Sequence, residues 1–301
     1  MKGLFIDASP ALAATLDAQP RPAGIEVDLN LAAQVEPETL PGLLAGYDFA
    51  LNDHSFMPTE VMRHCQGLRH VIFLGTGARS YMNPEALAEL GITVHIIKGY
   101  GDRAVAEHAF ALMFAAARGL AAMDRAMRAG TWRRTEGPEL AGKTVGLMGY
   151  GGIGREMAML CRAIGMRVLV WSRTPRPEPG ITFVELDTLL EQSQFLSLHL
   201  LLDDSTRGIL SAERLARLPE GAILVNTARG DLVDEAAMIE ALKSGRLGHA
   251  ALDVFALEPL PAGHPLTGLD NVTLSAHSAF RTPEASANLM RQALEIAGRL
   301  G

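Results

Sequence analysis

Short apolar runs alternate with helical segments over the first third of the chain, up to about residue 98. The predicted strands here are Leu4–Ile6, Phe49–Leu51, Val71–Leu74 and Thr93–Ile97, and the predicted helices include Pro58–Cys65 and Pro84–Leu90. Pro84 suits a first helical turn, and Gly91 suits the stop after it. This alternation is typical of a parallel sheet that is covered by helices.

The alternation restarts at Thr144, after one long amphipathic helix predicted over about Asp102–Ala122 and a polar connector, Gly130–Gly142. The strands predicted in this second part are Thr144–Met148, Arg167–Trp171, Phe195–His199, Ala222–Asn226 and Val272–Ser275. The last helical segment, Pro283–Leu300, has no further strand to pair with and can fold back on either part. The pattern therefore predicts an α/β protein with two doubly wound domains.

Composition supports two domains and narrows the range of partners. The chain has 301 residues, of which 48% are hydrophobic, enough for two separate cores. A net charge of -7 and the lack of a Lys or Arg block argue against a nucleic-acid partner. Cys65 and Cys161 are far apart and have no metal-ligand spacing, so we expect two buried thiols and no metal site.

The compartment is predicted from two stretches of the chain. Met1–Asp7 resembles a first β-strand more than the apolar stretch of a signal peptide. The most apolar helical stretch, Ala104–Ala122, carries charged residues such as Glu107 and Arg118, which would be costly in lipid. We therefore expect a cytoplasmic protein with no membrane span.

A glycine-rich turn lies between the apolar strand Val145–Met148 and the helix predicted over Arg155–Ile164. It has the G-x-G-x-x-G pattern, as Gly149-Tyr150-Gly151-Gly152-Ile153-Gly154. In such a turn the three glycines permit a tight turn, a close approach to a pyrophosphate and close packing of helix on strand. Because both the strand and the helix are in place, the motif predicts dinucleotide binding rather than an ordinary glycine turn.

The end of the next strand predicts which coenzyme is preferred. An NAD site usually has an acidic residue about 20 positions after the turn, to bind the ribose hydroxyls. This chain has Ser172-Arg173-Thr174 there. A cation flanked by two hydroxyls suits a 2′-phosphate, so we expect NADP(H) to be preferred, with NAD(H) possible. The alternative is that Arg173 is a solvated surface charge.

Three residues that follow separate strands have the chemistry for hydride transfer to a keto carbon. That reaction needs a proton donor and a cation that binds the substrate carboxylate. His277 can donate the proton, and Glu258 can orient its imidazole and favour the charged form. Arg229 has the permanent charge and forked geometry that match a carboxylate. The alternatives are a surface salt bridge for Arg229 and a hydrogen-bonded loop position for His277.

Five segments of the second half resemble the D-isomer-specific 2-hydroxyacid dehydrogenases. They are Glu139–Thr144, Phe195–His199, Asn226–Gly230 with Val233-Asp234, Ala251–Phe255 with Glu258-Pro259, and Ser275–His277. The resemblance implies a Rossmann coenzyme domain over 99–280. It also implies a flavodoxin-like substrate domain over 1–98 plus 281–301, with a cleft between the domains. A homodimer, formed partly by the long helix, is expected, and the substrate would be a small 2-keto or 2-hydroxy acid such as glyoxylate or hydroxypyruvate.

The resemblance also implies roles for individual residues. Arg229 would bind the substrate carboxylate and carbonyl, His277 would be the general acid/base, and Glu258 would be its carboxylate partner. Asp253 would hold the nicotinamide carboxamide. Further coenzyme contacts are expected at Val105, His199, Thr227 and Ala228. Backbone N–H groups that would face the substrate carboxylate belong to Gly75, Thr76, Gly77 and Ala78.

Some positions depart from the family pattern. Ala78-Arg79-Ser80 replaces the usual Val-Asp-Asn, so Arg79 is predicted to reach a second polar group of the substrate, with a surface charge as the alternative. Leu201 replaces a proline, which would alter the adenine side of the site. Ser172-Arg173 resembles the NADP-preferring glyoxylate and hydroxypyruvate reductases. His199 lacks a matching carboxylate, so we expect it to be structural or to face the coenzyme.

Two other functions remain open. A formate dehydrogenase on the same scaffold typically pairs its histidine with Gln, whereas this chain has Glu258. A coenzyme-sensing corepressor, similar to the C-terminal-binding proteins, would keep all three residues, Arg229, Glu258 and His277. Assaying 2-keto acid reduction separates an enzyme from such a corepressor.

Overall fold

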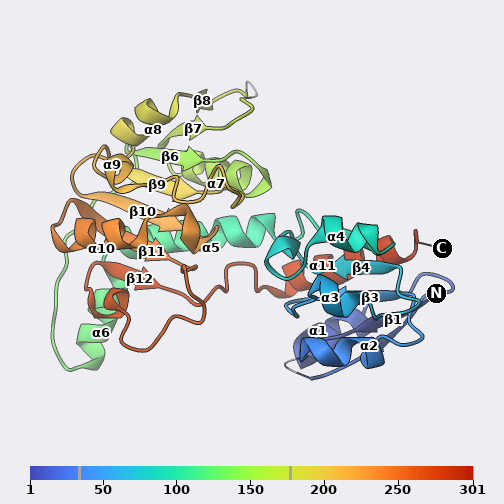
Figure 1. Cartoon of the computed structure of the whole chain (residues 1–301). Helices are drawn as coiled ribbons and strands as arrows, with labels where there is room; N and C mark the ends of the chain where they lie inside the picture. Colours follow the sequence, from blue (N-terminus) through green and yellow to red (C-terminus); the bar gives the residue numbers. More distant parts are fainter. Residues whose placement is uncertain (33–34, 176–177, 301) are drawn as a thin grey trace. The chain divides into compact units, whose positions relative to one another are not determined.

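The computed structural model describes residues 1–32, 35–175 and 178–300. These residues form two compact units, one of Met1–Gly101 with the segment from Arg281 onward, and one of Asp102–Phe280 (Figure 1). The chain passes between the units after Gly101, in the bend that follows the last strand of the first unit. The domain limit expected from the sequence lies three residues earlier, after residue 98.

The first unit is built on a parallel sheet of five strands in the order β2-β1-β3-β4-β5. The strands are β1 (Lys2–Phe5), β2 (Glu26–Leu29), β3 (Phe49–Asn52), β4 (His70–Phe73) and β5 (Thr93–Ile96). This is the flavodoxin-like order that was predicted. Sequence analysis missed β2, an edge strand in which charged Glu26 and Asp28 alternate with half-buried Val27 and Leu29.

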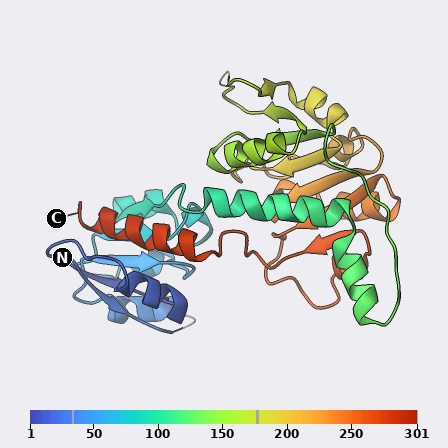
Figure 2. The ribbon, with the colours of Figure 1, turned by 180° about the vertical axis from the view of Figure 1, so that it is seen from behind.

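Helices cover both faces of this sheet. They are α1 (Pro10–Asp17), α2 (Leu40–Leu43), α3 (Thr59–Met62), α4 (Pro84–Glu89) and α11 (Pro283–Ala297), with 3-10 turns η1 (Pro37–Thr39) and η2 (Ala78–Ser80). Apolar side chains of α1 and α11 share one core with Phe5 and Phe49. Those of α2, α3 and α4 share the other with Leu4 and Val71. Figure 2 shows α11 lying along the strands of the first unit.

The second unit is built on a parallel sheet of seven strands in the order β12-β11-β10-β9-β6-β7-β8. The strands are β6 (Thr144–Met148), β7 (Arg167–Trp171), β8 (Thr182–Phe183), β9 (Phe195–Leu198), β10 (Ala222–Asn226), β11 (Leu247–Leu252) and β12 (Val272–Leu274). The order reverses between β6 and β9, which makes this a Rossmann sheet. Strand β8, of only two residues, was not predicted, whereas β11 is the strand expected before Asp253, for which no bounds were predicted.

Helices cover both faces of the second sheet as well. They are α5 (Asp102–Ala117), α6 (Leu120–Arg128), α7 (Gly152–Ala163), α8 (Leu186–Gln192), α9 (Ala212–Leu215) and α10 (Glu235–Lys243), with 3-10 turns η3 (Gly230–Leu232) and η4 (Pro265–Gly268). Helices α5 and α7 share one core with β6 and β7. Helices α8, α9 and α10 share the core of the opposite face.

The prediction of one helix over Asp102–Ala122 is wrong. Helix α5 ends at Ala117, and α6 begins at Leu120 with its axis bent by 66° from that of α5. Gly119 between them adopts left-handed backbone angles (φ 60°), which an α-helix cannot contain. No single helix among the described residues is long and apolar enough to cross a membrane, and only the bent pair α5 and α6 passes that test by length and composition.

Candidate functional site

Two glycines of the turn between β6 and α7 lie so close to neighbouring backbone atoms that no side chain would fit there. Gly149 has φ 107°, and a Cβ there would lie 2.3 Å from the His199 carbonyl oxygen. A Cβ at Gly154 would lie 2.4 Å from the Gly149 carbonyl oxygen. Gly151 caps α7 without a side-chain hydrogen bond, and a Cβ at Gly151 would meet nothing within 4 Å. The turn therefore fits a pyrophosphate at the amino end of α7.

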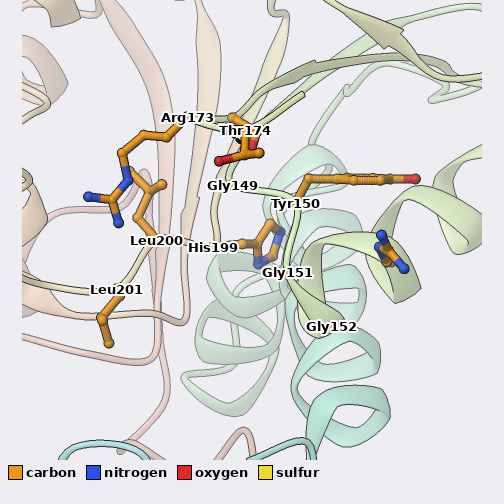
Figure 3. Close-up of a pocket in the computed structure, with 11 residues that line it drawn as sticks. Gly149, Tyr150, Gly151, Gly152, Arg173, Thr174, His199, Leu200 and Leu201 are labelled. Carbon is orange, nitrogen blue, oxygen red and sulfur yellow. Dashed lines mark hydrogen bonds between the residues drawn. The ribbon is translucent and has the colours of Figure 1, made fainter. Parts of the chain in front are cut away.

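A cavity of about 490 Å³ opens beside this turn (Figure 3). It is lined by Gly149, Tyr150, Gly151, Gly152, Arg155, Ser172, Arg173, Thr174, His199, Leu200 and Leu201. The glycine turn and the Ser172–Thr174 segment, which were predicted separately, thus meet in one cavity. Its volume lies within the range usual for cofactor pockets, and two guanidinium groups supply positive charge for phosphates.

Arg173 makes an ion pair that sequence analysis did not foresee. Its Nη1 lies 3.4 Å from Oδ2 of Asp203, and both side chains are solvent-accessible. The other carboxylate oxygen of Asp203 accepts hydrogen bonds from Ser205, and these bonds lower the pKa of Asp203. The guanidinium expected to bind a 2′-phosphate therefore has a carboxylate beside it. Thirty residues separate the two, so no local pattern could have revealed the pair.

His199 is neutral in this environment. Burial lowers its pKa to about 4, and its Nε2 is buried with no hydrogen-bond partner among the described residues. Oγ1 of Thr227, also expected to contact the coenzyme, is likewise buried and has no hydrogen-bond partner among the described residues. Figure 3 shows the His199 ring beside Gly149 and Gly151. A histidine that is neutral at pH 7 cannot be the proton donor for carbonyl reduction, but its Nε2 can hydrogen-bond a bound group.

Asp102, at the start of α5, is a further residue of this region that sequence analysis missed. A Cβ at Gly152 would lie 1.6 Å from Oδ2 of Asp102, so the carboxylate fills the space where a side chain would stand. Burial, and then the charge of Glu156, raise the pKa of Asp102. Val105, predicted to contact the coenzyme, lies one turn further along α5 and is buried.

The three candidate catalytic residues all belong to the second unit. His277 Nδ1 lies 2.6 Å from Oε2 of Glu258, and the Phe255 N–H donates to Oε1 of Glu258 at 2.9 Å. Burial acts to raise the pKa of Glu258, but the hydrogen bonds from His277 and Phe255, with the charge of Arg229, outweigh it and lower that pKa. Glu258 is therefore an ionised partner for the imidazole at neutral pH.

Arg229 is held in a half-buried loop directly after β10. The Asn226 side chain bridges this loop, accepting from the Ala228 N–H at 3.0 Å and donating to the Arg229 carbonyl at 2.8 Å. A Cβ at Gly230 would lie 2.0 Å from the Phe255 carbonyl carbon. This close approach packs the loop of Arg229 against the segment that leads to Glu258.

Asp253, predicted to hold the nicotinamide carboxamide, accepts hydrogen bonds from the loop that follows β12. It is fully buried, and its carboxylate accepts hydrogen bonds from Ser275 Oγ (2.6 Å), Ser278 N (3.0 Å) and Ala279 N (2.9 Å). Burial acts to raise the pKa of Asp253, but hydrogen bonds, from His108 and Ser275 first, lower it to about 2. Asp253 therefore anchors the loop that carries His277.

The predicted substrate loop lies in the first unit. The Gly75 N–H donates to the Phe73 carbonyl at 2.8 Å, and the residues after Thr76 enter the 3-10 turn η2. The Arg79 guanidinium pairs with Glu85, with Nη1 2.8 Å from Oε2, and its side chain is 74% exposed. This is the geometry of a surface ion pair. No group of three or more potential metal ligands occurs among the described residues, and both cysteines are free and buried.

Residues 110–279 match the model of the "D-isomer specific 2-hydroxyacid dehydrogenase, NAD binding domain". The chain belongs to the D-isomer specific 2-hydroxyacid dehydrogenase family. A D-3-phosphoglycerate dehydrogenase of Archaeoglobus fulgidus is 35% identical over 276 residues, which are 89% of this chain and 52% of that protein. This chain thus spans about half the length of that relative.

Two further members of the family are glyoxylate reductases. That of Aeropyrum pernix is 40% identical over 249 residues, covering 78% of this chain and 74% of the relative. The crystal structure of one from Paecilomyes thermophila superposes with a TM-score of 0.84 at 28% identity, covering 98% of this chain and 93% of that chain. The predicted family, the two-sheet α/β fold and the NAD-binding Rossmann unit of an oxidoreductase are therefore confirmed.

Proposed function

We propose that this member of the dehydrogenase family reduces a small 2-keto acid of the glyoxylate or hydroxypyruvate type, with NADPH preferred over NADH. The observation that carries the proposal is the 2.6 Å bond between His277 Nδ1 and the ionised Glu258, in loops that pack against the Arg229 loop. Such an imidazole can give a proton to a carbonyl oxygen while a guanidinium binds the adjoining carboxylate. The names of two relatives support a glyoxylate-type substrate.

Each residue has one chemical task in this proposal. A bound reduced nicotinamide supplies a hydride to the keto carbon. Arg229 holds the substrate carboxylate and polarises the carbonyl. His277 gives the Nε2 proton to the carbonyl oxygen, Glu258 stabilises the charged imidazole through Nδ1, and the imidazole is later reprotonated from water. The backbone N–H groups of Thr76, Gly77 and Ala78 are proposed to bind the substrate carboxylate, whereas the Gly75 N–H donates to Phe73.

The coenzyme is assigned to the cavity beside the glycine turn. Gly149–Gly154 would take the pyrophosphate, and Ser172, Arg173 and Thr174 would take the 2′-phosphate. Support comes from the cavity that all of these residues line and from the cation where an NAD site has a carboxylate. Val105, His199, Thr227, Ala228 and Asp253 remain proposed neighbours of the coenzyme, the last through the loop that it anchors.

The deciding experiment is a panel of 2-keto acids assayed with NADPH and NADH, repeated with Arg229→Ala and His277→Ala. Each variant should lose about 10³-fold or more in kcat/KM, because each removes a transition-state contact, while coenzyme binding persists. His264→Ala is the matched control, because His264 also pairs with a glutamate (Glu235, 3.2 Å) in the same unit. Near-normal turnover in His277→Ala would refute the assignment.

The homodimer is proposed to form through α6 and the connector that follows it. Three large apolar side chains of this segment are exposed: Leu120 (52%), Met127 (50%) and Trp132 (74%). A second copy of the chain that covered these side chains would remove their apolar surface from water. In light scattering, Met127→Asp combined with Trp132→Asp should give a monomer, whereas Leu31→Asp, also at an exposed leucine, should not. An unchanged mass for the double variant would exclude this interface.

A further inference from the structure

We propose that His108 on α5 is a positioning residue for His277, acting through Ser275 and Asp253. The inference rests on the proposed role of His277 as proton donor. His108 Nε2 lies 2.9 Å from Ser275 Oγ and 3.5 Å from Asp253 Oδ1. Ser275 Oγ in turn lies 2.6 Å from the same Asp253 oxygen. These three side chains come from α5, the end of β12 and the end of β11.

The hydrogen bonds in this network can run in only one direction. With a pKa of about 2, Asp253 is ionised at neutral pH and can only accept. The Ser275 hydroxyl therefore donates its proton to Asp253, which leaves its oxygen to accept from His108. His108 must then carry a proton on Nε2, whether its ring is neutral or charged. The network thus fixes both the orientation and the protonated nitrogen of His108.

The network ends on the backbone around His277. The Asp253 carboxylate accepts from the Ser278 and Ala279 N–H groups, and the Asp253 carbonyl accepts from the His277 N–H at 2.7 Å. His277 has φ 47° and is the only non-glycine with a positive φ among the described residues. Such a conformation costs about 1–3 kcal/mol and persists only where its surroundings hold it. Asp253 is that support, and His108 with Ser275 orients Asp253.

A second histidine of the same unit that bonds a hydroxyl, His249, provides a control. His249 Nε2 lies 2.9 Å from Thr273 Oγ1, a histidine–hydroxyl bond of the same length to a residue of β12, two positions before Ser275. No hydrogen bond joins Thr273 to Asp253 in the described part of the chain, where the Asp253 carboxylate instead contacts Ser275 Oγ, the Ser278 and Ala279 N–H groups and His108. Loss of His249 therefore removes a histidine–hydroxyl contact, a more buried one, but leaves the anchor of His277 intact.

The experiment compares His108→Leu, His108→Gln and His249→Leu in the full chain. In His108→Leu, kcat should fall about 10- to 100-fold with coenzyme Kd unchanged, because small displacements of a reacting group cost rate rather than binding. The alkaline limb of the reduction profile should also move to lower pH, since Glu258 stabilises the charged imidazole less when His277 is displaced from it. His108→Gln retains an N–H donor and should recover most of kcat. His249→Leu should lower stability without moving the pH profile.

Amide exchange tests the anchor without turnover. The Ser278 and Ala279 amides should exchange faster in His108→Leu than in wild type and His249→Leu, measured by NMR. If His108→Leu does not fold, Ser275→Ala breaks the same link and must show the same loss of kcat and protection. Unchanged protection, or a pH profile like that of His249→Leu, would overturn the inference. Absence of keto-acid reduction in the wild type would instead refute the proposed function and leave the exchange result valid.

Discussion

At the scale of single residues, environment separates two histidines that both follow strands of the second sheet. His277 lies against an ionised carboxylate, and its imidazole remains accessible, with 40% of the side chain exposed. The Nε2 of His199 is buried, although the residue lines the cavity beside the glycine turn, and desolvation lowers its pKa to about 4. The same side chain is thus a candidate acid in one loop and a neutral hydrogen-bonding group in the other.

Coenzyme preference is proposed to depend on the Arg173–Asp203 pair. Asp203→Asn keeps an oxygen that can accept from Ser205 but removes the charge that competes for Arg173. The ratio of kcat/KM for NADPH to that for NADH should rise about two- to fivefold, because exposed pairs contribute up to about 1 kcal/mol. Arg173→Ala should lower that ratio well below the wild-type value. Steady-state assays with both coenzymes measure it.

Asp204→Asn is the control for this experiment, because it removes a neighbouring charge that has no ion pair with Arg173 in the described structure. If Arg173→Ala leaves the ratio unchanged, Arg173 does not bind a 2′-phosphate and the proposed preference for NADPH is wrong. If Arg173→Ala lowers the ratio but Asp203→Asn leaves it unchanged, the proposed preference for NADPH stands and Asp203 has no effect on it.

At the scale of elements, one glycine divides the helix that the apolar pattern predicts as continuous. The apolar spacing of Asp102–Ala122 runs across the break, so periodicity alone does not reveal it. Gly119 adopts φ 60°, and a Cβ there would lie 2.8 Å from Cγ2 of Thr135. The bend brings the chain into α6, whose exposed apolar side chains form part of the proposed dimer surface.

Gly119→Ala should therefore lower the free energy of unfolding. The loss should exceed that of an alanine substitution at another glycine with left-handed backbone angles whose Cβ would meet no neighbouring atoms. Gly130→Ala is that control, since Gly130 has φ 78° and nothing within 4 Å of a Cβ. We expect a loss of about 1–2 kcal/mol for Gly130→Ala from backbone strain alone, and a larger loss for Gly119→Ala from the added contact with Thr135. Urea denaturation measures both, and equal losses would rule out crowding at Gly119.

At the scale of the whole molecule, each unit has its own sheet and its own pair of cores, so each has a basis for independent stability. Both tryptophans, Trp132 and Trp171, belong to the second unit. Tryptophan fluorescence therefore reports on the unit that carries the proposed coenzyme and catalytic residues. A chain of two units need not unfold in one step, so a signal that comes from the second unit alone can follow its unfolding separately.

The second unit should lose stability as the pH falls from about 6.5 to 4. Burial lowers the pKa of both His199 and His249 to about 4, so the unfolded chain binds more protons than the folded one in this range. The contribution of each neutral histidine to the free energy of unfolding is fully present above pH 6.5. It falls by up to about 3 kcal/mol as the pH approaches 4. Asp253, with a pKa of about 2, contributes to pH dependence only below this range.

Urea denaturation followed by tryptophan fluorescence at pH 7.5 and pH 5 tests this expectation. His249→Gln should reduce the difference in unfolding free energy between the two pH values, even where it lowers stability at both. An unchanged difference would show that His249 does not titrate as its burial implies.

The sequence by itself determined the features that neighbouring residues encode. The glycine turn of the coenzyme unit lies between one strand and one helix, so its motif and its context are both readable within about 20 residues. The order of apolar strands likewise predicted two doubly wound sheets. Motifs around Arg229, Glu258 and His277 indicated which residues could meet at the edge of a parallel sheet, because the carboxyl ends of its strands lie together.

Only the tertiary structure decided which distant side chains meet. His108 contacts Ser275 across 167 positions, and Arg173 contacts Asp203 across 30. It also showed that Asp253 is turned toward its own loop and that short edge strands such as β2 and β8 complete the sheets. The physical reason is that these contacts depend on how helices and loops pack, and packing is set by the whole core rather than by local periodicity.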